Sequence, residues 1–113
     1  MPTENAAILL AAATSTRMGE ATEDKVLMPL HGVPALCYSL NAFIASGQVR
    51  RFVVVYRDEA QWKRLAEAIG QHCELGGREL LWTAGGRERQ DSVFNALMEV
   101  SLLVDYVFIH DCA

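Results

Sequence analysis

The segment that follows the first apolar run of the chain has the composition of a phosphate-binding loop. Residues 6–10 read Ala-Ala-Ile-Leu-Leu, residues 11–19 read Ala-Ala-Ala-Thr-Ser-Thr-Arg-Met-Gly, and Lys25 follows a few residues later. Small side chains let backbone N–H groups approach phosphate oxygens, and Arg17 and Lys25 supply positive charge against a polyphosphate. A strand that leads into such a loop therefore predicts a nucleotide-phosphate site.

Polar side chains also follow two later apolar runs. Residues 84–92 read Ala-Gly-Gly-Arg-Glu-Arg-Gln-Asp-Ser, and His110 and Asp111 end the last run. Alone, a glycine pair indicates a turn, and an aspartate at a strand end indicates a helix N-cap. Ligands in open α/β sheets, however, bind beyond the carboxyl ends of the strands, at a topological switch point. We therefore expect three segments to converge there: residues 11–19, 84–92 and 110–112.

The elements that would position these segments follow from periodicity. Four apolar runs alternate with amphipathic stretches, which predicts the order β-α-β-α-β-α-β. Residues 6–12 and 52–56 are apolar on both faces, as central strands of a parallel sheet are. Residues 80–83 and 106–109 predict the other two strands. The expected fold class is α/β, a Rossmann-like three-layer fold with a mostly parallel sheet.

Three helices are expected between these strands. The first has Pro34 in its first turn and Gly47 at its C-terminal cap, and the second begins at the N-cap Asp58 and stops near Gly70. Gln61 lies three residues after Asp58, as in a capping box. Apolar residues at helical spacing form the expected buried faces, namely Leu36, Leu40, Phe43 and Ile44, then Trp62, Leu65, Ala66 and Ile69, then Val93, Ala96, Leu97 and Val100.

Composition narrows the function classes. The chain has 113 residues, of which 51% are hydrophobic, so it forms one domain at most and can bury a core without disulfides. The net charge of −4, with scattered basic residues, argues against a nucleic-acid or membrane surface. The three cysteines have no C-x-x-C spacing, which favours a reducing cytoplasm. No apolar run is long enough for a membrane span, so we expect a soluble cytoplasmic protein.

Four motifs carry a resemblance when they are taken in order. They are residues 11–19, Lys25 with Leu30, residues 85–93, and the closing His-Asp-Cys-Ala of residues 110–113. Together they resemble the 2-C-methyl-D-erythritol 4-phosphate cytidylyltransferases of the non-mevalonate isoprenoid pathway. The resemblance covers nearly all of this chain and about the first half of an ordinary family member. It implies that residues 1–113 are the N-terminal part of a single nucleotidyltransferase domain and that a further half is absent.

The resemblance implies a reaction and a role for each motif. The reaction is transfer of CMP from CTP to 2-C-methyl-D-erythritol 4-phosphate with release of pyrophosphate, which needs in-line positioning and cations over the developing charge. By position, Arg17 and Lys25 match the family's basic pair at the triphosphate, and Asp111 matches the carboxylate that holds Mg²⁺. The matching phosphate loop is Ala11, Ala12, Ala13 and Ser15. The segment that matches the cytosine and ribose contacts is Gly85, Gly86, Arg89 and Ser92.

The chain departs from the family pattern at several positions. Ala13 and Ser15 replace glycines of the first loop, and Leu10 replaces a proline. If either glycine position needs positive φ, the replacement costs roughly 1 kcal/mol or more. Arg87 stands where an acidic residue is common, and Cys112 where alanine is. The family's later half carries most of the acceptor site and a dimerising arm, so the resemblance implies a homodimer at full length and no turnover by this chain alone.

Other readings stay open. A ribitol-5-phosphate cytidylyltransferase would share these loops and differ in its acceptor, and the replaced glycines would also suit a catalytically silent nucleotide-fold protein. A dinucleotide-binding oxidoreductase ranks lower, because no G-x-G-x-x-G follows the first strand. A Walker-type nucleotidase lacks its G-x-x-x-x-G-K-[ST] motif. We expect His110 to be a structural hydrogen-bonding residue, and Trp62 and Trp82 to be packing residues.

Overall fold

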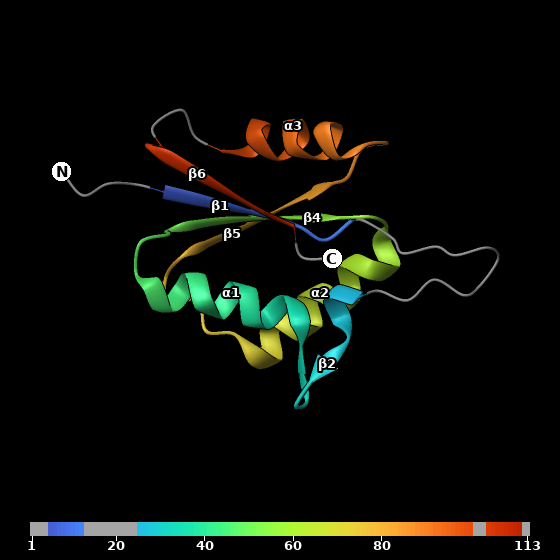
Figure 1. The fold of residues 1–113 in the computed structure, drawn as a ribbon, viewed down its shortest axis with the longest axis vertical. Coiled ribbons are helices and arrows are strands. Elements are labelled where there is room, and N and C mark those ends of the chain that lie inside the picture. Colours follow the sequence, from blue (N-terminus) through green and yellow to red (C-terminus); the bar gives the residue numbers. More distant parts are fainter. Residues whose placement is uncertain (1–4, 13–24, 101–103, 112–113) are drawn as a thin grey trace.

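A parallel four-stranded sheet lies between two layers of helices in the computed structural model, which describes residues 5–12, 25–100 and 104–111 (Figure 1). The strand order is β5-β4-β1-β6, and each neighbouring pair is parallel. The strands are β1 (Asn5–Leu10), β4 (Arg51–Tyr56), β5 (Glu79–Ala84) and β6 (Tyr106–Asp111). The predicted alternation of strands and helices, the α/β class and the parallel sheet are confirmed.

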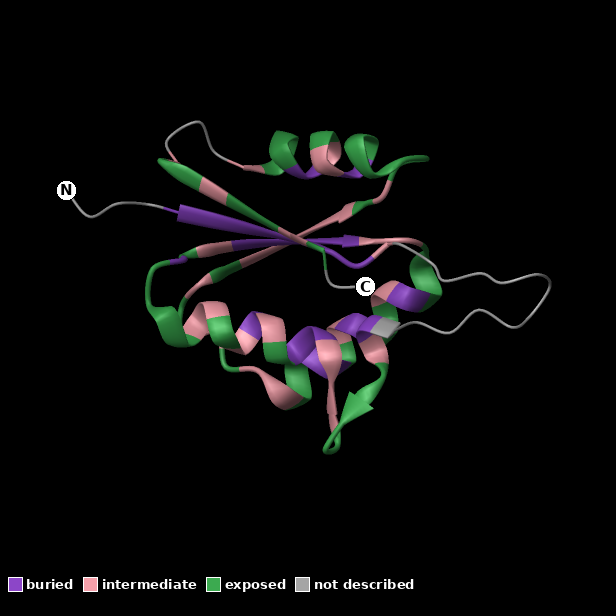
Figure 2. Cartoon of the chain, viewed as in Figure 1, coloured by how far each residue is buried: buried purple, intermediate pink, exposed green. Residues whose placement is uncertain are grey.

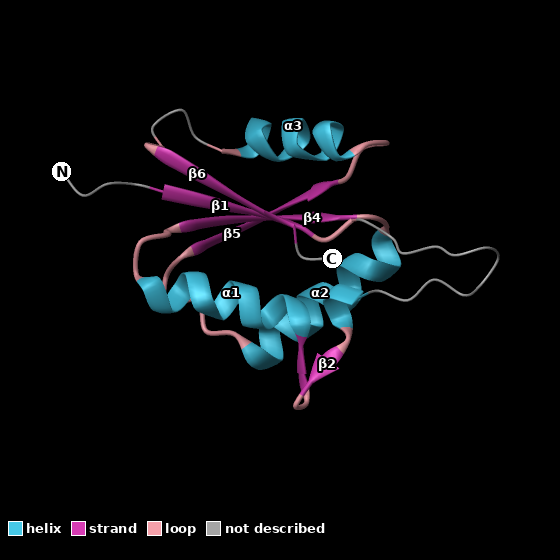
Figure 3. Cartoon of the chain, in the orientation of Figure 1, coloured by secondary structure: helices cyan, strands magenta, loops and turns pink. Residues whose placement is uncertain are grey.

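The helices cover both faces of the sheet (Figure 3). Two helices lie on one face, α1 (Ala35–Ser46) and α2 (Glu59–His72), and α3 (Arg89–Glu99) lies on the other. Before α1 come a 3-10 turn and a short antiparallel hairpin, namely η1 (Lys25–Leu27), β2 (Pro29–Leu30) and β3 (Val33–Pro34). In the described part of the chain, no helix is both long and apolar enough to cross a bilayer.

Burial explains why β1 and β4 are central. Their apolar residues alternate between two cores, as the pleat of a strand requires. Leu9 and Val54 pack with α1 and α2, whereas Ile8 and Val53 pack with α3 through Ala96. Figure 2 shows this burial along both strands. The prediction that these two runs form central strands is confirmed.

Helix ends agree with the sequence in some places and differ in others. Gly47 adopts the left-handed conformation, with φ 71°, and caps α1 as predicted. Asp58 accepts a hydrogen bond of 2.8 Å from the backbone N–H of Gln61, which confirms the N-cap of α2. The prediction that α2 stops near Gly70 is confirmed to within two residues, since the helix ends at His72. Pro34 precedes α1 instead of lying in its first turn.

Several apolar residues of α3 and β6 are exposed. Leu97, predicted to be buried, is 43% exposed, because α3 turns Ala96 toward the sheet instead. On β6, Tyr106, Phe108 and Ile109 are also largely exposed. Exposed apolar side chains on both faces of β6 therefore mark an edge strand that the described residues leave partly uncovered.

Two predictions about aromatic residues hold. Trp82 makes edge-to-face contacts with Trp62 and Tyr56, with ring centroids 6.1 and 6.4 Å apart, so both tryptophans serve packing. His110 lies 3.0 Å, through Nε2, from the hydroxyl of Ser39, and its ring packs on Phe43. It is therefore a structural hydrogen-bonding residue of the β6–α1 contact, as expected.

Candidate active site

A cleft lies at the carboxyl edge of the sheet, where the described parts of the three predicted loops come together. It has a volume of about 360 Å³, which is within the range of small-molecule sites. Because all four strands are parallel, their carboxyl ends share this edge. The residues that line the cleft are Leu10, Ala12, Gly86, Arg87, Glu88, Arg89, Ser92 and Asp111. Five of the sequence-predicted site residues therefore meet in one cavity.

Arg89 and Asp111 form a two-pronged ion pair across this cleft. Nε of Arg89 lies 3.0 Å from Oδ1 and 3.2 Å from Oδ2 of Asp111, and Nη2 lies 3.1 Å from Oδ2. The hydrogen bonds and the charge of Asp111 raise the pKa of Arg89. The pair joins the first turn of α3 to the end of β6, and no local sequence pattern predicts it. Its signal, an arginine and an aspartate on two segments expected to converge, was present in the sequence.

The glycine pair before α3 allows the segment of residues 84–92 to approach the start of the first loop at Ala12. A Cβ on Gly85 would lie 2.8 Å from Cβ of Ala12 and 3.1 Å from Oγ of Ser92, closer than side chains pack. The backbone N–H of Gly86 donates to Oγ of Ser92 over 3.1 Å, and a Cβ on Gly86 would collide with Asp91. Close packing, and not positive φ, therefore requires glycine at both positions.

Ser92 has a structural role beside its predicted one. It is only 7% exposed, at the base of the cleft, and its oxygen accepts the Gly86 N–H. A hydroxyl that accepts one bond retains its own hydrogen for donation. Ser92 thus fixes the loop backbone and can still donate to a ligand.

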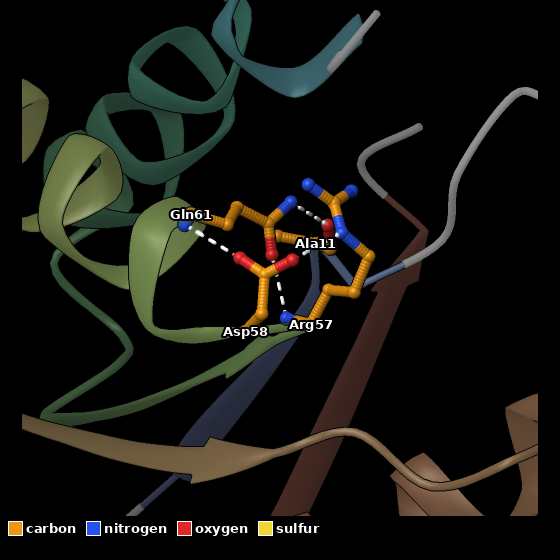
Figure 4. Close-up of polar contacts among 4 residues, drawn as sticks. All are labelled: Ala11, Arg57, Asp58 and Gln61. Atoms are coloured by element: carbon orange, nitrogen blue, oxygen red, sulfur yellow. Dashed lines mark hydrogen bonds and ion pairs between the residues drawn. The ribbon is translucent and has the colours of Figure 1, made fainter. Parts of the chain in front are cut away.

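Gln61 is a buried polar residue at this edge with a role that its position in a capping box does not indicate. It is 1% exposed. Its side-chain Nε2 donates to the carbonyl of Ala11 over 2.7 Å, and its Oε1 accepts from the backbone N–H of Arg57 over 2.6 Å (Figure 4). Ala11 is itself fully buried and so contributes backbone to the start of the first loop. No local pattern reveals a contact between residues 50 positions apart in the chain.

Other predicted site residues lie outside the described part of the chain. They are Ala13, Ser15 and Arg17, and the neighbouring Cys112 lies outside it as well. Lys25 begins η1, and its side chain is not among those described. Their roles at the triphosphate stay predictions.

The acidic residues of the cleft are compatible with a hard cation. Mg²⁺ needs one or two carboxylates when substrate phosphates and water complete its shell. Asp111 and Glu88 both line the cleft, and the carboxylate of Asp111 is more than half exposed. Among the described residues, no group of three or more His, Cys, Asp or Glu side chains could hold a metal alone. The donor set therefore fits a cation shared with a phosphate ligand.

Comparison with known proteins gives one family. The family model described as 2-C-methyl-D-erythritol 4-phosphate cytidylyltransferase matches residues 5–113. Among curated relatives with this name, one from Dictyoglomus thermophilum is 35% identical over 108 residues, covering 94% of this chain and 43% of the relative. One from Solibacter usitatus is 37% identical over 113 residues, covering 94% and 45%.

Solved structures agree on the fold. The crystal structure of 4-diphosphocytidyl-2C-methyl-D-erythritol synthase from Anaerococcus prevotii superposes with a TM-score of 0.75 at 15% identity, over 99% of this chain and 44% of that one. The chain thus spans less than half the length of the relatives it matches. The match over residues 5–113 shows that the chain belongs to the 2-C-methyl-D-erythritol 4-phosphate cytidylyltransferase family.

Proposed function

We propose that this chain supplies the nucleotide-binding part of a cytidylyltransferase that transfers CMP from CTP to 2-C-methyl-D-erythritol 4-phosphate and releases pyrophosphate. The observation that carries the proposal is the cleft, in which Ala12, Gly86, Arg89, Ser92 and Asp111 meet at the carboxyl edge of the sheet. Family membership supplies the reaction.

In this proposal each part of the cleft has a separate task. The backbone after β1, with Arg17 and Lys25, binds the triphosphate. The segment from Gly85 to Ser92 binds cytosine and ribose, because the Ser92 hydroxyl keeps its own hydrogen for donation while it accepts the Gly86 N–H. Asp111 holds Mg²⁺, which when bound offsets charge on phosphate oxygens. Phosphoryl transfer then depends on in-line positioning of the acceptor phosphate and on these cations.

Asp111 has to exchange partners for this role. Its carboxylate is bound by Arg89, and both side chains are well exposed, at 56% and 60%. An exposed ion pair is weak, because water screens it. Asp111 would hold the cation through the same carboxylate, and the Arg89 guanidinium would then be available to the nucleotide.

Calorimetric titration of the chain with CTP, with and without Mg²⁺, tests the nucleotide site. We expect binding that Mg²⁺ strengthens and that is weaker for ATP. Absence of heat with CTP under both conditions would overturn the proposal and favour the silent nucleotide-fold reading.

The acceptor needs a second measurement. Ribitol 5-phosphate is the alternative acceptor. The full gene product that contains this chain should release pyrophosphate from CTP with 2-C-methyl-D-erythritol 4-phosphate and not with ribitol 5-phosphate.

We also infer a cytoplasmic location from the cysteine usage and a homodimer from the resemblance. Light scattering of the full gene product checks the dimer.

A further inference from the structure

The β1–β4 ladder ends with a side chain between the two strands. The N–H of Ala11 donates to the carbonyl of Val55 over 3.0 Å. Hydrogen bonds of a parallel ladder are evenly spaced, so the next one would join the N–H of Arg57 to the carbonyl of Ala11. Both of these groups instead bind Gln61, through Oε1 at 2.6 Å and Nε2 at 2.7 Å. The primary amide of Gln61 therefore takes the place of the next ladder bond.

The geometry of α2 holds this amide in place. The backbone N–H of Gln61 donates to Asp58 Oδ1 over 2.8 Å, which fixes Gln61 in the first turn of the helix. Its side chain is 1% exposed, and both ends of its amide have backbone partners. Figure 4 shows Gln61 between Ala11 and Arg57. Loss of the amide would remove a hydrogen bond from the buried Ala11 carbonyl and one from the half-buried Arg57 N–H, which is costly.

An inserted amide also sets how the chain leaves β1. Two strands joined through a side chain lie farther apart than two strands joined directly, so β1 separates from β4 at Ala11. The chain then passes Ala12, which lies against Gly85 and lines the cleft. The place of Ala12 in the cleft thus depends on the Gln61 bridge.

We propose that Gln61 is a positioning residue of the nucleotide site, which sets the place of Ala11 and Ala12 at the edge of the cleft. The inference rests on the proposed function, since it takes this cleft as the nucleotide site. A purely structural helix cap would need only the bond to Asp58. The two further bonds reach the strands on either side of the loop exit, and these assign the positioning role.

The variant Gln61→Glu tests the inference through pH. A protonated glutamic acid has one donor and one acceptor, like the amide, whereas an ionised one only accepts and would face the carbonyl of Ala11. Burial raises the pKa of such a carboxyl, which brings its titration into a usable range. We expect the ratio of CTP dissociation constants, variant over parent, to be near one in acid and to rise about tenfold or more with pH.

Gln71→Glu is the matched control. Gln71 lies on the same helix, is exposed and contacts Glu67, so its ratio should stay flat across pH. Circular dichroism at each pH confirms folding. If Gln61→Glu unfolds at high pH, Gln61→Met replaces it, with affinity expected to fall about tenfold at every pH. Affinity equal to the parent's would overturn the inference.

Hydrogen exchange of the Arg57 amide, measured without nucleotide, separates the two proposals. Exchange in Gln61→Met should be faster than in the parent, because methionine has no oxygen to accept the Arg57 N–H. Unchanged Arg57 exchange, or a flat affinity ratio when the parent binds CTP, overturns the Gln61 inference alone. Failure of the parent to bind CTP overturns the proposed function, and with it the nucleotide role of Gln61.

Discussion

Arg89 holds both carboxylate oxygens of Asp111, so the start of α3 and the end of β6 are joined across the mouth of the cleft. The two residues lie 22 positions apart in the chain. Because both are well exposed, the pair contributes little to folding. Its position over the proposed nucleotide site indicates that its importance lies in binding.

Asp111→Asn should separate these two roles. Asparagine keeps the shape of the side chain and removes its charge, so Mg²⁺-dependent CTP affinity should fall by about tenfold or more, because hard cations prefer carboxylates. The midpoint of thermal unfolding should barely change. Calorimetry and a melting curve measure the two quantities. Glu74→Gln, at an exposed residue beyond α2, is the control for charge, and CTP affinity equal to that of Asp111→Asn would contradict the prediction.

Gly85→Ala should disturb both the fold and the site. The added Cβ would meet Ala12 at 2.8 Å, so we expect a loss of about 1–3 kcal/mol in the free energy of unfolding and weaker CTP binding. Urea unfolding measures the first effect. Gly70→Ala is the matched control, because a Cβ there meets nothing within 4 Å and Gly70 lies inside α2. It should stabilise the chain by up to about 1 kcal/mol.

Acid should weaken the start of α2 through Asp58. The backbone N–H of Gln61 and then the hydrogen bond from Arg57 lower the pKa of this carboxyl. A folded-state pKa below the unfolded value of about 3.9 means that the stabilisation is present above that value and is lost as the pH falls through the folded pKa. The measurement is the urea midpoint at about pH 6 and about pH 3, which lie on either side of the unfolded pKa. The midpoint should fall less between these pH values for Asp58→Asn than for the parent. Parallel pH curves for the two proteins would refute this.

The thiols of Cys37 and Cys73 should resist alkylation in the folded chain. Burial raises the pKa of Cys73 to about 12, and burial also raises the pKa of Cys37. The reactive thiolate is therefore scarce near neutral pH. In a Cys112→Ser background, iodoacetamide at about pH 8, below the ordinary thiol pKa, should label neither residue until urea is added. Rapid labelling of either cysteine without urea would contradict the prediction and show that its thiol is accessible in the folded chain.

Much of the fold could be predicted from local patterns. Buried runs such as residues 52–56 identify central strands because only a covered parallel sheet buries both faces of a strand. Gly47 and Asp58 marked helix ends by their conformational and hydrogen-bonding preferences. The predicted burial of Leu97 was wrong because tertiary packing decides which residues of α3 face the sheet.

The candidate site was predictable only in outline. Converging loops follow from a parallel sheet, and the cleft contains Arg89, Ser92 and Asp111 as expected. Their mutual contacts were not predictable, since the Arg89–Asp111 pair and the Gln61 bridge depend on distances between residues far apart in the sequence. The capping-box position is by itself a sufficient reason for a glutamine at residue 61. The pattern therefore does not indicate the bonds of its side chain to Ala11 and Arg57.

The bridge at the end of β1 and β4 has a consequence for redesign. Strand direction is usually fixed by many backbone pairs, which protein engineers cannot alter one at a time. Here the final spacer between two strands is a replaceable group on α2. A substitution at Gln61 would therefore change how the chain leaves β1 at Ala11 while the backbone pairs of the sheet keep their register.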